Sequence, residues 1–173
     1  GIVLQGYKQA VIGNEEFRYG EHYCLVNGVD IPSLNNITGA APDKPFLAIA
    51  LAIDQRLAAE LSASIPPTST AGASFYSGVS VAEVEPDILE AFWRLTETLY
   101  DPAQMAVLSP MIVREIHYRV LMGPQGGCLR MLSTAGSQSN QIAESISWLR
   151  QNFVAPFHVN ELAARMNMAT TTF

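Results

Sequence analysis

The pattern of apolar residues changes partway along the chain, and this change limits the folds that the chain can adopt. Up to about residue 54, alternating and apolar segments are separated by turn-forming residues, as in strands. After Pro86 the apolar spacing is helical. Strands followed by helices predict an α+β fold. The expected strands lie in Ile2 to Ile12, Phe17 to Val29 and Phe46 to Ile53, with turns at Gly13-Asn14, Asn27-Gly28, Asn35-Asn36 and Ala41-Pro42-Asp43.

Proline and capping residues mark the expected ends of the first helices. A short helix is expected from Asp54 to Ser64, and one or two further strands from Ser74 to Val84. Pro86 suits the first position of the next helix, and Asp101-Pro102 is expected to end it.

A further helix is expected from Pro110 to Met122, because Ser109 can cap it and Gly123-Pro124 can stop it. One side carries an apolar stripe. Arg114, Tyr118 and Met122 form a second ridge at i, i+4 and i+8, with residue types that are enriched in interfaces. We expect this ridge to pair two subunits, with a merely solvated face as the alternative.

The last segment has the spacing of two short helices joined by a tight turn. Asn167 stands where the backbone must be left-handed, and a second helix would start within residues 168–173. DNA-binding domains of the helix-turn-helix type have this geometry, and Thr170 and Thr171 would then contact DNA. The alternative is an ordinary helical hairpin, which has the same spacing. The first helix presents one apolar face of Val159, Leu162, Ala163 and Met166.

The same segment resembles the first helix-turn-helix unit of the AraC/XylS family of bacterial transcription regulators. Relatives usually have glycine at Asn167 and serine at Ala169, so the match is incomplete there. The residues that carry the resemblance are Trp148, Arg150, Asn152, Phe153, Pro156, Val159, Leu162, Ala163, Met168 and Phe173.

The earlier part of the chain is similar to the amino-terminal effector domain of one AraC-type subfamily. His22 departs from it, because relatives usually have glycine there, and Gly20 is expected to take over the bend. The resemblance implies a cupin-like β-barrel followed by dimerisation helices and a truncated helix-turn-helix. It is carried by Leu4 to Lys8, Tyr19, Val29 to Pro32, Pro45 to Leu47, Asp54, Val113 to Leu121, Gly123-Pro124 and Gly126.

The implied domain organisation has three parts. Residues 1–132 form the sensing and dimerisation domain, and residues 140–173 begin the DNA-binding domain. Residues 133–139 have the Ser- and Gly-containing composition of a linker.

A small barrel holds at most one small ligand, so the aromatic residues of the strands are candidates for its lining. The ligand-binding candidates are Tyr7, Tyr19, His22, Tyr23 and Phe46. The alternative is that these side chains only fill the core.

Three histidines, His22, His117 and His158, fall on a barrel segment, a long helix and a loop, so they do not suit one metal centre. His117 is expected at the surface or in an interface. The sequence contains no catalytic or phosphate-binding motif, and we expect no enzyme, no cofactor and no metal. A stand-alone cupin-type small-molecule-binding protein or metal-dependent cupin enzyme remains the alternative function.

The charge balance argues against DNA binding by this chain alone. Residues 1–138 hold eight Lys and Arg against fourteen Asp and Glu, and residues 139–173 hold two of each. A DNA-binding face needs clustered cations, and none is present. DNA is therefore expected as a partner only of a full-length regulator.

Composition bounds the remaining properties. Hydrophobic residues make up 49% and charged residues 15%, and the mean hydropathy is +0.15, which suggests that apolar surface meets a partner. No long uncharged apolar run or charged signal-peptide start occurs, so a cytoplasmic protein without a membrane partner is expected. Cys24 and Cys128 are expected as buried free thiols, with a disulfide as the alternative.

These observations predict the effector-sensing and dimerisation part of an AraC-type regulator. We expect a homodimer that binds a small-molecule effector whose identity the sequence does not give.

Overall fold

The structure is a computed structural model that describes residues 1–27, 33–65, 78–133, 138–154 and 156–170. The strands in these parts are β1 (Ile2–Gln5), β2 (Tyr7–Ile12), β3 (Glu15–Gly20), β4 (Tyr23–Asn27), β5 (Ser33–Thr38), β6 (Leu47–Ile49) and β7 (Val79–Glu83). The helices are α1 (Gln55–Ser64), α2 (Pro86–Glu97), the 3-10 helix η1 (Thr98–Tyr100), α3 (Pro102–Met122), α4 (Gly126–Ser133), α5 (Gln138–Asn152) and α6 (Val159–Arg165).

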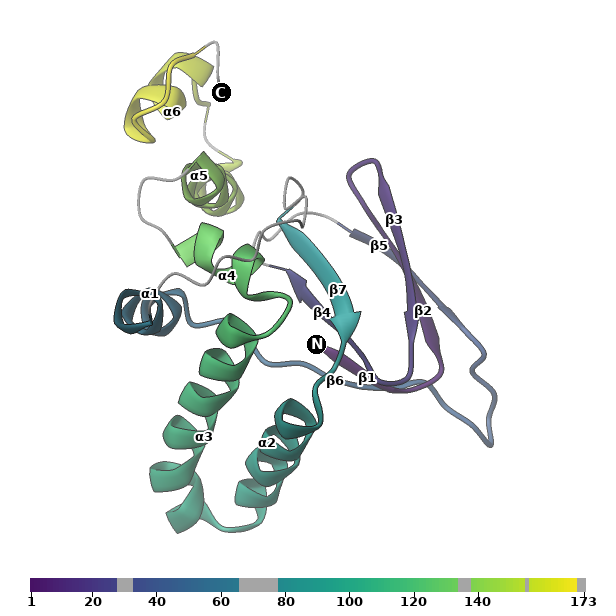
Figure 1. Cartoon of the computed structure of the whole chain (residues 1–173). Coiled ribbons are helices and arrows are strands. Elements are labelled where there is room, and N and C mark those ends of the chain that lie inside the picture. The colour runs from purple at the N-terminus through teal and green to yellow at the C-terminus, as the bar shows by residue number, and fades with distance from the viewer. Residues whose placement is uncertain (28–32, 66–77, 134–137, 155, 171–173) are drawn as a thin grey trace.

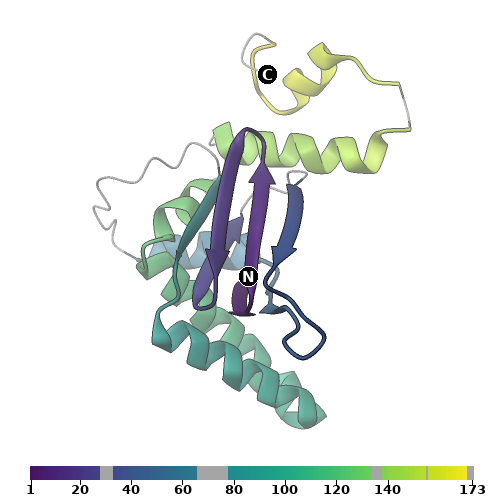
Figure 2. The ribbon, with the colours of Figure 1, turned by 90° about the vertical axis from the view of Figure 1, so that its right-hand side faces the viewer.

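The chain folds into three layers, and the α+β class predicted from the sequence is confirmed. A four-stranded antiparallel sheet, in the order β6-β1-β4-β7, lies in the middle. A three-stranded antiparallel sheet, in the order β3-β2-β5, covers one face of it, and helices α1 to α4 cover the other (Figure 1). Figure 2 shows the three-stranded sheet in front of the helical layer, with α5 across one end of the strands.

Side chains of the middle sheet alternate between two apolar cores, as the twofold periodicity of a strand requires. Ile2 and Val26 point to the helices and join a large cluster with Ile88, Phe92 and others. Val3 points to the opposite face and joins a smaller cluster between the sheets. The smaller cluster consists of Val3, Ala10, Ile12, Tyr19 and Val79.

The expected closed barrel is not what the described strands form. A closed barrel needs a continuous ladder around the whole circumference. Among the described residues, no strand pairing joins the β3-β2-β5 sheet to the β6-β1-β4-β7 sheet. The arrangement is therefore a pair of facing antiparallel sheets.

Two bends divide the first two strand-like segments. Gly6, with φ +87°, separates β1 from β2 and lets the chain pass from one sheet to the other. Between β3 and β4, His22 itself adopts the left-handed conformation, with φ 67°. The expectation that Gly20 takes over this bend is wrong, because Gly20 remains in the ladder opposite Tyr7.

Strand β5 corrects the turn expected at Asn35-Asn36. Both asparagines pair with β2 inside the strand, Asn35 opposite Ala10 and Asn36 opposite Gln9. All six residues of β5 are exposed, so the strand has no apolar alternation to reveal it. The turn expected at Asn27-Gly28 cannot be described, because Gly28 lies outside the described residues. Residues 74–77, the first part of the strand expected from Ser74 to Val84, also lie outside them.

Helix α3 is longer than the helix expected from Pro110. Asp101 caps it by accepting hydrogen bonds from the backbone N–H groups of Ala103 and Gln104, and Pro102 occupies its first turn. Ser109 is not a cap, because its hydroxyl pairs with that of Thr98 at 2.8 Å. The expected stop after Met122 is confirmed.

The turn between α3 and α4 ties the helices to the middle sheet. The side-chain amide of buried Gln125 donates to the backbone carbonyls of Cys24 in β4 and Ser80 in β7, at 2.8 and 2.9 Å. A Cβ on Gly126 would lie 1.9 Å from the carbonyl oxygen of Leu121. Only glycine fits this turn without a backbone shift.

The C-terminal helices pack through Trp148 of α5. The Phe157 ring meets the Trp148 ring edge to face, with centroids 5.9 Å apart, and the Arg165 guanidinium lies over the Trp148 ring. Asn167 has φ 53°, so the left-handed residue expected there is confirmed. Three of the four residues on the expected apolar face of α6 are buried; Val159 is exposed.

Gly126→Ala is expected to lower the free energy of unfolding by roughly 2–3 kcal/mol, because the added methyl meets backbone rather than a movable side chain. Urea unfolding followed by circular dichroism measures this change. Gly13→Ala is the control: nothing lies within 4 Å of its added Cβ, so only the cost of φ +60° remains. Equal losses of unfolding free energy in the two variants would contradict a collision between the added methyl and the carbonyl of Leu121.

Candidate functional site

Three of the five predicted ligand-binding residues line one hollow at the edge of the three-stranded sheet. This tyrosine hollow has a volume of about 560 Å³. Tyr7, Tyr19 and Tyr23 come from three different strands, so only the fold brings them together. The remaining lining residues are Lys8, Gln9, Arg18, Gly20 and Thr38.

Tyr7 and Tyr19 enter the tyrosine hollow from opposite faces of their sheet. Tyr19 is buried and points into the cluster between the sheets, whereas Tyr7 is 60% exposed. The Tyr7 ring lies over two glycines: a Cβ on Gly20 would be 2.4 Å from it, and a Cβ on Gly39 would be 3.3 Å from it. These glycines leave the room that the ring occupies.

The sequence did not reveal the basic side chains of the hollow, Lys8 and Arg18. Lys8 pairs with Tyr19 across the β2–β3 ladder, and Arg18 pairs with Gln9. The turn at Gly13-Asn14 could have revealed them, because it fixes the register of β2 and β3 and so which of their residues lie side by side.

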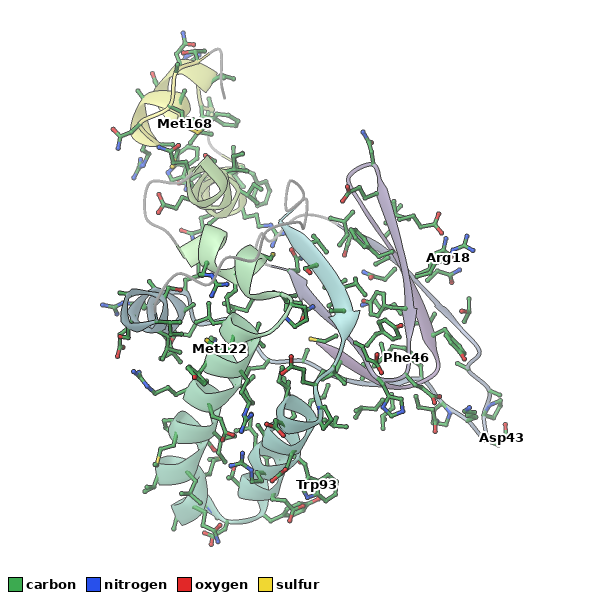
Figure 3. The ribbon with its side chains drawn as sticks, in the orientation of Figure 1. Arg18, Asp43, Phe46, Trp93, Met122 and Met168 are labelled. Atoms are coloured by element: carbon green, nitrogen blue, oxygen red, sulfur yellow. The ribbon has the colours of Figure 1, made fainter. Side chains whose placement is uncertain are left out.

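The other two candidates lie beside the hollow rather than in its lining. Phe46 is half-buried and packs against the cluster between the sheets; Figure 3 shows it among these side chains. His22 is exposed in the turn between β3 and β4. Next to it, the pKa of Glu21 is lowered by a hydrogen bond from the backbone N–H of Gly6, and then by Lys44 at 3.6 Å.

The predicted dimer ridge is exposed and is part of a longer stripe. Because α3 begins at Pro102, Val107 and Met111 continue the line of Arg114, Tyr118 and Met122 along one face of the helix. Arg114 also forms an ion pair with Glu60 of α1 at 2.9 Å. We call these five residues the α3 stripe.

The flank of α3 beside the α3 stripe is fixed to its neighbours by polar contacts. Glu115 accepts hydrogen bonds from Arg94 of α2 at 2.6 Å and from Arg119 at 2.8 Å, and Arg119 also reaches Asp87. The bonds from Arg94 and then Arg119 lower the pKa of Glu115. The i,i+4 pair of Glu115 and Arg119 therefore joins α2 to α3.

His117 is buried, so its expected surface position is wrong. Its Nε2 accepts the backbone N–H of Asp54 at 3.0 Å, and its Nδ1 donates to the carbonyl of Val113 at 2.8 Å. The Asp54 side chain caps α1 through the N–H groups of Arg56 and Leu57. The pair thus fixes the start of α1 against α3.

The described residues contain no group of three His, Cys, Asp or Glu side chains placed to hold a metal ion. Cys24 and Cys128 are both free and buried, as expected. Burial raises the pKa of the Cys128 thiol to about 11. Both therefore act as small apolar core residues.

The C-terminal DNA-binding candidates lie at the limit of the described chain. Thr170 is exposed, and Thr171 lies outside the described residues. No helix in the described parts of the chain is long and apolar enough to cross a membrane.

The family model for the AraC-type transcriptional regulator N-terminus matches residues 1–128. The chain belongs to this family. Comparison with curated proteins and with solved structures gives no further match. The matched range covers both sheets and α1 to α3, together with the start of α4, so the AraC-type domain includes the tyrosine hollow and the α3 stripe. Because this is a family of transcription regulators, membership argues against the hypothesis that the chain is an enzyme.

The contacts of Glu115 predict a pH-dependent contribution to stability. Its folded-state pKa is depressed, so the contribution is present above the unfolded pKa of about 4.3 and is lost as the pH falls through the folded value. Glu115→Gln is expected to cost about 1 kcal/mol at pH 7 and less at pH 4. Urea unfolding at both pH values measures this.

Glu90→Gln is the control, because Glu90 is more exposed and lies 3.9 Å from Arg94. A Glu115→Gln cost that does not change between the two pH values would contradict the prediction.

Proposed function

We propose that this chain is the effector-sensing and dimerisation part of an AraC-type transcription regulator, followed by the start of its DNA-binding domain. The observation that carries the proposal is the family match over residues 1–128, the range that contains the hollow and the exposed stripe. A role in regulating transcription would place the protein in the cytoplasm. The sheets are proposed to be a cupin-like arrangement that is open rather than closed.

The effector is proposed to bind in the tyrosine hollow. Its volume of about 560 Å³ lies in the usual range for small-molecule sites. Lys8 supplies positive charge, Arg18 supplies a guanidinium that is ion-paired with Glu16, and Tyr7, Tyr19 and Tyr23 supply rings and hydroxyl groups. These groups suit a small organic anion. Phe46 and His22 act beside the site, Phe46 by supporting the sheet and His22 by shaping the turn before Tyr23.

A thermal-shift screen of small carboxylates tests this assignment. A binder at about 100 times its Kd adds about 2.7 kcal/mol to stability, so the Tm of the protein is expected to rise. Tyr7→Ala removes an exposed ring of the hollow and is expected to reduce this rise. Tyr100→Ala, at an exposed position of η1, is the matched control and is expected to keep it. Equal responses in the two variants would place the binder elsewhere.

The α3 stripe is proposed as the seam of a homodimer. Its spacing repeats every three or four residues over four turns, which allows two helices to pack side by side. Tyr, Met and Arg are residue types enriched in interfaces. The occupant proposed for this face is a second copy of the chain.

Sedimentation velocity tests the seam. The chain is expected to sediment as a dimer at tens of micromolar, and Met111→Glu is expected to weaken the dimer by at least roughly tenfold, because it buries an unpaired charge. Trp93→Glu is the matched control: Trp93 is similarly exposed but lies on α2, on the side away from α3 (Figure 3). A monomeric parent chain, or equal loss in both variants, would contradict the seam.

The proposed domain organisation is the one predicted from the sequence: residues 1–132, a linker of residues 133–139 and a truncated helix-turn-helix from residue 140. The linker bounds are corrected at both ends, because Ser133 belongs to α4 and α5 already begins at Gln138. Residues 134–137, between these helices, lie outside the described residues. Helix α6 and the left-handed Asn167 have the geometry of the first half of a helix-turn-helix. Thr170 and Thr171 would then start the DNA-reading helix of a full-length protein.

A further inference from the structure

A second cavity lies on the helical side of the middle sheet, separate from the tyrosine hollow. We call it the sheet–helix cavity. Its volume is about 240 Å³, and its walls come from β4, the segment after β6, α2, α3 and α4. The exposed residues Gly1 and Ala52 stand at its rim. Its apolar walls include Val26, Ile53, Phe92, Ile116, Val120 and Leu129.

The polar groups of the walls offer little to a charged ligand. No Asp, Glu, Lys or Arg side chain is among the described lining residues. Both ring nitrogens of His117 already have backbone partners, Asp54 and Val113. The thiol of Cys24 is buried, and burial raises its pKa, so it presents a neutral sulfur. At the rim, the α-amino group of Gly1 donates to the carbonyl of Leu25 at 2.8 Å, and burial lowers its pKa and so favours its neutral form. A charge placed among the apolar walls would lose its hydration without gaining a partner.

We propose that the sheet–helix cavity is a binding site for a small, uncharged, mainly apolar molecule, such as a single substituted aromatic ring. Protein interiors are close-packed and contain few voids larger than a water molecule. An apolar cavity of about 150 Å³ stays dry and binds benzene or xenon, and this cavity is larger. A water molecule needs two to four polar partners, which the apolar part of the lining does not supply.

This site goes beyond the proposed function, because it differs from the tyrosine hollow in position and in the chemistry that it accepts. The hollow presents Lys8 and Arg18 and suits an anion. The cavity presents hydrocarbon and suits a neutral ligand. The two sites therefore predict opposite preferences between a neutral ring and its carboxylate.

Toluene and benzoate are the probes that test the cavity. Methyl NMR of the whole chain reports the position of binding, since Val26, Ile116 and Leu129 line the cavity, whereas Val3, Ile12 and Val79 belong to the cluster between the sheets. Toluene is expected to cause saturable shifts in the first group only. Benzoate at the same concentrations is expected to leave the first group unchanged, whether or not it binds in the tyrosine hollow.

Two substitutions test whether the free volume is what binds. Val120→Phe is expected to fill the cavity and to abolish the toluene response. Val26→Ile adds one methylene to the wall and is expected to weaken toluene binding roughly tenfold, which keeps the test available if the larger substitution does not fold. Val3→Ile makes the same chemical change in the other cluster and is the matched control, with toluene affinity expected to stay unchanged.

Three results would overturn the proposal: no saturable toluene shift up to its solubility, shifts of equal size in both methyl groups, or equal weakening by Val26→Ile and Val3→Ile. None of these results depends on dimerisation, DNA or an effector in the tyrosine hollow. Failure of the cavity is therefore distinguishable from failure of the regulatory role.

Discussion

The arrangement of helices over sheet depends on one buried amide, the side chain of Gln125. It donates to backbone carbonyls of two adjacent strands, at Cys24 and Ser80, from the turn that joins α3 to α4. Removing this amide would leave one buried and one half-buried carbonyl without these hydrogen bonds, and the protein would lose the stability that both bonds contribute. Gly126 lets the chain reverse immediately afterwards, against the carbonyl of Leu121. This turn fixes the distance between the middle sheet and α3, and so the space in which the sheet–helix cavity lies.

Sequence signals located the elements whose ends are determined locally. Asp54 caps α1, Pro86 opens α2 and Asn167 turns left-handed, each where its chemistry predicts. The start of α3 was misplaced because Asp101-Pro102 both ends one helix and begins the next. Ser109 resembles a cap in sequence, but its hydroxyl is bonded to Thr98. Strand β5 was missed because its residues are held by backbone pairing with β2 rather than by burial.

The candidate sites were harder to predict because they depend on which face each strand presents. The aromatic residues were correctly associated with the sheets, but register sends Tyr19 inward and Tyr7 outward. His117 is polar and lies in a helix, so it resembled a surface residue. Its burial is possible only because Asp54, 63 residues earlier, supplies the partner for Nε2. No local pattern contains that information.

The C-terminal helices are attached to the AraC-type domain by packing as well as by the chain. Leu129 of α4 lines the sheet–helix cavity, α5 packs against α4, and Ile146 of α5 reaches the large apolar cluster. Farther along α5, Trp148 holds Phe157 and Arg165 of the C-terminal segment. Close-packed groups transmit displacement, whereas a flexible linker does not. A change in the position of α4 is therefore expected to displace α5 directly, because the two helices are already in contact.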